Sequence, residues 1–137
     1  MIGLDTNVLL RYLAQDDPIQ SPVATNLIER VLTEEEPGYV SIVAIVEAIW
    51  VMERSYRLTR PEIAAAIKRV LQIEVVCVER EQDVFNAMMN VKAGLGSFSD
   101  SLIGILGARA GCTHTVTFDR KALRLSGFQP IASQIEH

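Results

Sequence analysis

The sequence predicts an α/β fold in which helices cover both faces of a short parallel sheet. Short β-like runs at 2–4, 38–41, 74–78 and 115–118 alternate with longer segments whose apolar residues recur at helical spacing. Strands that alternate with helices pair in parallel, and both faces of such a sheet are covered. The length of 137 residues and the hydrophobic content of 49% predict a single domain over residues 1–137 with a sizeable core.

Two helices are predicted after the first strand. The strand at 2–4 ends at Asp5, and the helix predicted over 7–14 stops at the segment DDP, residues 16–18. Apolar residues at helical spacing then predict a helix over 20–34.

The strand at 38–41 leads into a helix that holds one glutamate among apolar residues. Ser41 can cap this helix, and the run IVAIVEAIWVM at 42–52 contains a single charged residue, Glu47. The neighbours of Glu47 one helical turn away are all apolar, whereas a glutamate on a solvated face normally has polar neighbours there. We therefore interpret Glu47 as a candidate functional group.

The second half of the chain is predicted from caps, β-branched runs and breaks. Thr59, Pro61 and Glu62 form a capping-box pattern that opens a helix to about Leu71. The remaining predicted elements are a buried strand at 74–78, a helix over 80–93, a short helix opened by Asp100 and capped by Ser99, a strand at 115–118 that ends at Asp119, and an edge strand at 130–133.

The composition argues against several classes of protein. The net charge of −4 is unlike that of a general phosphate-binding surface, because such domains are usually basic. Cys77 and Cys112 have no zinc-like spacing with a histidine, so we interpret them as buried thiols of a reduced protein. No secretory signal is recognisable and no apolar run reaches the ~20 residues of a membrane helix, which predicts a soluble cytoplasmic protein.

Four carboxylates stand out because each is flanked by apolar sequence, where an unpaired charge would be costly. They are Asp5, Glu47, Asp100 and Asp119. Asp5 and Asp119 also follow strands, and ligands of parallel sheets bind outside the carboxyl ends of the strands. Other acidic residues, such as Glu79 and Asp83, lie in charged stretches and are expected to be ordinary solvated surface.

Each of the four has a structural alternative. Asp5 can cap the helix that follows it, and Asp100 can complement the helix dipole. Asp119 can be a turn residue or half of a surface ion pair. Glu47 can pair with Arg11 or Arg54 in a buried ion pair. A single shared site explains all four residues together.

A cluster of carboxylates predicts a divalent cation. Clustered carboxylates raise each other's pKa, so they persist together only when a positive charge lies among them. No histidine or cysteine joins the four, and an oxygen-only ligand set favours Mg²⁺ or Mn²⁺ over zinc. Such an ion activates a water and stabilises charge on a phosphodiester during displacement.

Over almost its whole length the chain resembles PIN-domain nucleases of the VapC type, the toxin half of bacterial toxin–antitoxin pairs. The resemblance is carried by LDTNVLLRYL at the start, Glu47 in its apolar helix, FSDSLIGILGARAG and TVTFDR. Gly104 and Gly107 depart from the family pattern, in which alanines are common at these helix positions.

The resemblance implies a three-layer α/β/α sandwich with a short parallel sheet and Mg²⁺- or Mn²⁺-dependent endoribonuclease activity. It also implies a homodimer, an RNA substrate and an antitoxin that blocks the site. Carried onto this sequence, the acidic metal site is Asp5, Glu47, Asp100 and Asp119, and Thr6 helps to order it. The expected nucleophile is a metal-activated water, and the lone His114 is interpreted as structural.

The residues after Asp119 offer local contacts for phosphate. Arg120, Lys121 and Arg124 are candidate contacts to the RNA backbone, or alternatively a solvated helix face.

Other functional classes fit the sequence less well. A receiver-like signalling domain would need an acceptor aspartate after the strand at 74–78, and a haloacid-dehalogenase-like phosphatase would need an aspartate where Asn7 stands. The remaining alternative is a PIN scaffold that binds RNA or a protein partner without cutting.

Overall fold

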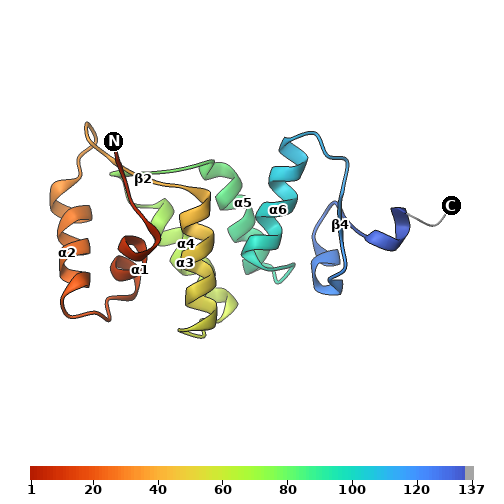
Figure 1. The fold of residues 1–137 in the computed structure, drawn as a ribbon, viewed down its shortest axis with the longest axis horizontal. Helices are drawn as coiled ribbons and strands as arrows, with labels where there is room; N and C mark the ends of the chain where they lie inside the picture. The colour runs from red at the N-terminus through yellow and green to blue at the C-terminus, as the bar shows by residue number, and fades with distance from the viewer. Residues whose placement is uncertain (135–137) are drawn as a thin grey trace. The chain divides into compact units, whose positions relative to one another are not determined.

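The chain divides into two compact units, Met1–Glu81 (unit 1) and Gln82–His137 (unit 2), and the computed structural model describes residues 1–134 (Figure 1). Six α-helices and short parallel strands make up the two units. The predicted α/β class is therefore confirmed. That residues 1–137 act as one domain stays a prediction.

Unit 1 contains a three-stranded parallel sheet in the order β1-β2-β3. Ile2 pairs with Gly38, and Tyr39 pairs with Cys77. The strands are β1 (Ile2–Gly3), β2 (Gly38–Val40) and β3 (Val76–Val78), and the helices are α1 (Thr6–Ala14), α2 (Gln20–Asn26), α3 (Ile42–Arg54) and α4 (Arg60–Leu71). Two helices lie in each connection between strands, as the parallel arrangement requires.

Local caps fix where the helices of unit 1 begin. Ser41 accepts a hydrogen bond from the backbone N–H of Ala44 at 3.1 Å. Thr59 and Glu62 form the reciprocal capping box at the start of α4. Both caps predicted from the sequence are confirmed, because they depend only on residues within one helical turn.

The core of unit 1 lies between its helices and its sheet. Leu9, Ile45, Ile49, Ile67 and Val70 are at most 1% exposed. Helix α1 packs against both α2 and α3. This packing brings the start of α1 and the middle of α3 close together.

The helix predicted over 20–34 is shorter than expected. Helix α2 passes into a π-helical turn, η1 (Leu27–Val31), in which Leu32 N–H donates to the Leu27 carbonyl at 2.9 Å. The helical backbone then ends, because Leu32 adopts an extended conformation.

Unit 2 pairs two helices with a separate two-stranded parallel sheet. Its elements are α5 (Glu81–Lys92), α6 (Phe98–Arg109), β4 (Thr115–Thr117), the 3₁₀ turn η2 (Arg120–Arg124), β5 (Phe128–Pro130) and the 3₁₀ turn η3 (Ile131–Gln134). Val84, Phe98, Leu102 and Leu125 are buried in its core.

Two predicted boundaries in unit 2 are wrong. Helix α6 begins at Phe98 and is capped by Ser97 rather than Ser99, with Asp100 N–H donating to Ser97 Oγ at 3.1 Å. Phe98 is only 1% exposed, so its burial in the core favours the earlier start. The last strand covers Phe128–Pro130 instead of 130–133, because Thr115–Thr117 pairs with that earlier segment.

The two glycines of α6 that depart from the family pattern have a packing reason. A Cβ on Gly104 would lie 2.5 Å from Cε1 of Phe128, and one on Gly107 would lie 3.3 Å from Oγ1 of Thr115. Glycine at both positions therefore lets β4 and β5 approach α6 closely.

Candidate functional site

Asp5 lies just after β1, at the start of α1. Its backbone is extended and its Oδ1 accepts a hydrogen bond from Val8 N–H at 3.0 Å. Asp5 is thus a helix cap, which was its structural alternative. Its side chain is exposed, and no described residue donates a hydrogen bond to its second oxygen, Oδ2. One carboxylate oxygen therefore remains open to solvent for a ligand.

Glu47 lies against the same helix start through a side-chain hydrogen bond. Thr6 Oγ1 donates to Glu47 Oε1 at 2.5 Å, which joins α1 to α3. This bond places the Glu47 carboxylate beside the residue that follows Asp5. The resemblance implied that Thr6 helps to order a site that contains Asp5 and Glu47, and the structure shows the contact between Thr6 and Glu47.

The surroundings of Glu47 differ from those expected. Glu47 is exposed, and Val43 and Trp50 on the same face of α3 are 75% and 53% exposed. The apolar run therefore does not bury the carboxylate. Among the described residues no arginine pairs with Glu47, because Arg54 lies over the Trp50 ring at 4.9 Å and Arg11 binds Gln20 and Asp16.

The other two candidate carboxylates belong to unit 2. Asp100 is half-buried in the first turn of α6. Asp119 is exposed and caps η2, since its Oδ1 accepts from Lys121 N–H at 2.9 Å. Its own N–H donates to Thr117 Oγ1 at 2.9 Å. The structural alternative for Asp119, a turn residue, is observed here.

The four carboxylates are divided between the units, with Asp5 and Glu47 in one and Asp100 and Asp119 in the other. Within residues 1–134, no three side chains of the types His, Cys, Asp and Glu form a group that could hold a metal ion. The convergence of all four carboxylates on one ion therefore stays a prediction.

The ligand chemistry present fits a hard cation. Around the start of α1 the side-chain donors are oxygens of Asp5, Thr6 and Glu47. His114 is occupied elsewhere, with Nδ1 2.9 Å from Thr113 Oγ1 and Nε2 3.0 Å from Gln134 Oε1. Oxygen-only donors of this kind suit Mg²⁺ or Mn²⁺ better than zinc.

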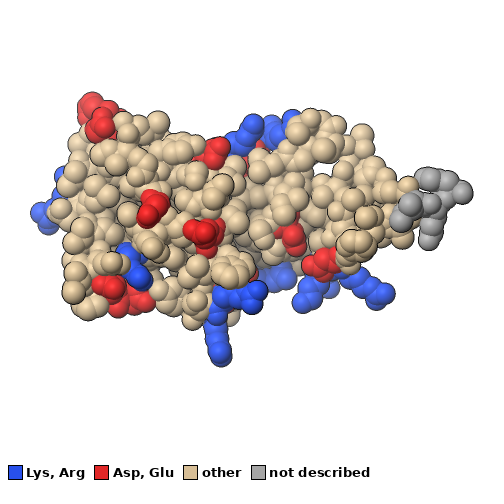
Figure 2. All heavy atoms as spheres, viewed as in Figure 1, with Lys and Arg blue, Asp and Glu red and all other residues tan. Residues whose placement is uncertain are grey.

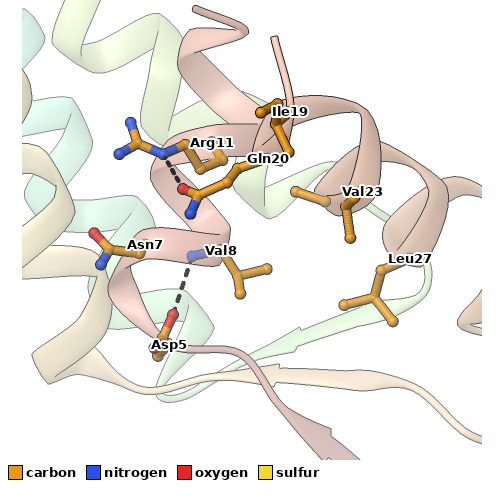
Figure 3. Close-up of a pocket in the computed structure, with 9 residues that line it drawn as sticks. Asp5, Asn7, Val8, Arg11, Ile19, Gln20, Val23 and Leu27 are labelled. Carbon is orange, nitrogen blue, oxygen red and sulfur yellow. Dashed lines mark hydrogen bonds between the residues drawn. The ribbon is translucent and has the colours of Figure 1, made fainter. Parts of the chain in front are cut away.

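A cavity of about 430 Å³ adjoins Asp5 within unit 1 (Figure 3). Figure 3 shows Val23 on α2 and Leu27 on η1 facing Val8 on α1 across this space. Arg11 Nε donates to Gln20 Oε1 at 2.8 Å on its wall. Nothing in the sequence predicts this cavity, because its apolar residues have the spacing of an ordinary helix core.

The three candidate phosphate contacts lie together on η2. Arg120, Lys121 and Arg124 are all exposed. Within the described part of the chain, none of them forms an ion pair. Their positive charges therefore remain available to an anion.

Two acidic residues predicted to be solvated surface have structural roles instead. Asp83 is 2% exposed and binds Arg109 through both carboxylate oxygens, with Arg109 Nη2 2.8 Å from Oδ1. The hydrogen bond and the charge of Asp83 raise the pKa of Arg109. Glu79 Oε1 accepts from Ile42 N–H at 2.8 Å at the start of α3.

The two cysteines also differ from expectation. Cys77 and Cys112 are free and exposed, so the prediction that they are buried is wrong. Cys77 points away from the core because it alternates with the buried Val76 and Val78 along β3.

Among residues 1–134, no helix is long and apolar enough to cross a membrane.

The PIN domain family model matches residues 2–127, so the chain belongs to this family. The predicted PIN-like α/β sandwich class is thereby confirmed. A relative similar to this chain is a VapC ribonuclease of Aquifex aeolicus (strain VF5). It is 25% identical over 128 residues, which cover 93% of each chain.

Proposed function

We propose that this protein is a metal-dependent endoribonuclease that hydrolyses RNA phosphodiester bonds, and that it is the toxin of a type II toxin–antitoxin system. Membership of the PIN domain family supports a nuclease. The relative named a VapC ribonuclease, which aligns along almost the whole chain, supports RNA as the substrate.

The observation that carries the proposal is the hydrogen bond from Thr6 to Glu47. It holds an exposed carboxylate from the middle of α3 against the start of α1, where Asp5 presents a second one. A helix cap alone would need neither Glu47 nor this contact between helices. A divalent cation gives the two carboxylates a reason to be near each other.

The ion would be held by Asp5, Glu47 and Asp100, with Asp119 either completing the set, holding a second ion or acting through a water. A bound Mg²⁺ or Mn²⁺ lowers the pKa of water and neutralises charge on the phosphodiester. Thr6 orients the Glu47 carboxylate by donating to one oxygen, which leaves the other free. Arg120, Lys121 and Arg124 supply positive charge for phosphates beside the cleaved bond.

The decisive experiment compares ribonuclease activity of the purified protein with that of Asp5→Asn and Glu47→Gln. Asparagine also caps helices, so Asp5→Asn removes the charge and keeps α1. Each variant should lose several kcal/mol of transition-state stabilisation, so we expect its kcat/KM to fall by roughly 100-fold or more. Chelation of divalent cations should abolish cleavage, and added Mg²⁺ or Mn²⁺ should restore it.

Matched controls separate the site from general charge effects. Asp17→Asn makes the same change at the start of α2, where Asp17 Oδ1 accepts from Ile19 N–H and Gln20 N–H. Glu53→Gln makes the same change as Glu47→Gln on α3. Both controls should cleave like the wild type. Equal activity of Asp5→Asn and the wild type would overturn the proposal and favour a non-catalytic PIN scaffold.

The same proposal includes the partners. A type II toxin is held inactive by a cognate antitoxin protein, and we propose that this chain has one, that it forms a homodimer and that it acts in the cytoplasm. The VapC name of the relative supports an antitoxin partner.

A further inference from the structure

Phe118 is the most exposed of the large apolar side chains described in this chain. It is 88% exposed, whereas Phe98 in the same unit is 1% exposed. A single exposed apolar residue is common on protein surfaces and needs no explanation by itself. Phe118 becomes informative through the way the backbone holds it and through the charges that surround it in sequence.

Hydrogen bonds on both sides of Phe118 hold the backbone turn that exposes its side chain. Thr117 Oγ1 accepts from Asp119 N–H at 2.9 Å, so this bond spans Phe118. Asp119 Oδ1 in turn accepts from Lys121 N–H at 2.9 Å. Before Phe118, strand β4 is paired with β5. The ring therefore projects from a fixed turn and not from a loose chain end.

Positive charge gathers directly after this ring. Arg120, Lys121 and Arg124 lie within the next six residues. Residues 82–134 carry five Lys and Arg against three Asp, a net charge of +2, whereas residues 1–81 carry eight basic and thirteen acidic residues, a net charge of −5. Figure 2 shows Lys and Arg side chains projecting from unit 2 near η2. Although the net charge of the whole chain is negative, residues 82–134 carry a net positive charge.

An exposed aromatic ring beside unpaired cations is the pattern that single-stranded nucleic acids require. Bases stack on aromatic faces while cations follow the phosphates. A protein partner of this surface would need matching acidic groups, but it would not explain why a hydrogen-bonded turn presents an exposed ring next to Asp119. Asp119 belongs to the acidic set of the proposed nuclease, so a ring next to it lies where a bound strand would pass.

We propose that Phe118 stacks on an unpaired base of the RNA while Arg120, Lys121 and Arg124 contact the adjoining phosphates. The inference rests on the proposed ribonuclease function and deepens it, because it assigns a positioning residue for the substrate strand. Every base has a π face, so this contact places the strand without selecting its sequence. It also requires the RNA to be unpaired at that point.

The test measures binding of a fluorescently labelled single-stranded RNA of about ten nucleotides, with a chelator present so that it is not cut. Phe118→Leu removes the ring and keeps apolar bulk, and we expect it to raise Kd by roughly 5- to 150-fold, the cost of one lost base stack. Phe85→Leu is the matched control, since Phe85 is 42% exposed in the same unit. It should leave Kd unchanged.

A second variant reports stacking directly. Phe118→Trp in a Trp50→Phe background places the only indole of the protein at the proposed contact, since the chain has one tryptophan. RNA should quench its emission, and affinity should match that of the wild type. In cleavage assays with Mg²⁺, Phe118→Leu should raise KM more than it lowers kcat, because stacking is a binding interaction.

The outcomes separate this inference from the function on which it rests. Wild-type and Phe118→Leu proteins that bind and cut RNA equally would overturn the stacking role and leave the nuclease intact. Failure of the wild type to cut RNA would overturn the function, while the binding assay still decides the role of Phe118. If Phe118→Leu weakens self-association or binding to a protein and leaves RNA binding unchanged, the ring is a protein contact and the inference is wrong.

Discussion

The hydrogen bond from Thr6 to Glu47 connects two helices through a pair of side chains. Its distance of 2.5 Å is that of a short bond between a hydroxyl and a carboxylate. The bond holds one Glu47 oxygen in place, and the proposed role of Glu47 depends on that orientation. Residues that orient a metal ligand usually change affinity or activity by roughly 10- to 100-fold when they are replaced.

Replacing Thr6 tests this role of the hydrogen bond. Thr6→Val keeps the shape of the side chain and removes the donor, so kcat/KM at fixed Mg²⁺ should fall by about 10-fold or more. Thr6→Ser keeps the donor and should retain activity. Circular dichroism of both variants checks that α1 is intact. A valine variant with full activity would show that the bond has no functional role.

The sequence predicted the positions of the candidate site residues better than their surroundings. Asp5 and Asp119 follow strands, and Asp100 lies in a first helical turn, because these positions depend on local patterns. The structural alternative for Glu47 was a buried ion pair, whereas the structure exposes Glu47 together with Val43 and Trp50. Which face of a helix is covered depends on its neighbours in space, and a run that is apolar all round does not encode this.

The same limit explains the missed ion pair between Asp83 and Arg109. Asp83 lies in a charged stretch, yet the partner that allows its burial is twenty-six positions away in sequence. Nothing local distinguishes it from its solvated neighbours Glu81 and Gln82. A charged side chain can be buried only when an opposite charge or hydrogen-bond partner lies beside it, and the tertiary fold brings that partner there.

The capping box at the start of α4 lies within one helical turn, and its contribution to stability depends on pH. Hydrogen bonds from the backbone N–H and the hydroxyl of Thr59 lower the pKa of Glu62 below its ordinary value of 4.5. A lowered pKa in the folded state adds stability that is fully present above pH 4.5 and is lost as the pH falls through the folded value.

Comparison of the wild type with Glu62→Gln tests this pH dependence, because glutamine can still form the capping box but does not titrate. The stability advantage of the wild type, measured by urea unfolding, should be present at pH 6 and should shrink as the pH falls below about 4. Thr59→Ala should lower stability by about 1 kcal/mol at neutral pH. An advantage that does not change with pH would contradict the assigned role of the capping box.

The helix that opens with a complete capping box was predicted closely, whereas the strand that depends on distant pairing was not. Helix α4 was expected to reach about Leu71 and does so. Strand β5 was misplaced, because its bounds follow from pairing with β4 rather than from its own residues. The two separate sheets, β1-β2-β3 and β4-β5, replace the single sheet that alternation of strands and helices suggested.

For the whole molecule, the net charge of −4 conceals an acidic unit 1 and a basic residue set at 82–134. The net charge of the whole chain argued against phosphate binding, whereas the distribution of the charged residues along the chain permits it. Divalent cations should stabilise the folded chain, because the proposed metal site exists only when the chain is folded.

We expect Mg²⁺ or Mn²⁺ to raise the melting temperature of the wild type. An ion at about 100 times its Kd stabilises the folded state by about 2.7 kcal/mol, which is several degrees for a chain of this size. Differential scanning fluorimetry should show the rise in the wild type and in Glu53→Gln. Glu47→Gln should show little or none. A rise of the same size in all three proteins, or in none, would contradict the proposed metal site.

The contact between Gly104 and the Phe128 ring reverses a common rule of protein engineering. Exchanging a helical glycine for alanine normally adds roughly 0.5–1 kcal/mol of stability. At this position the added methyl group would meet Cε1 of Phe128 at 2.5 Å, so the ring would have to leave its place against α6. Restoring the alanine typical of the family would therefore gain helix propensity and lose the packing of the Phe128 ring, so libraries designed for higher stability should keep glycine at position 104.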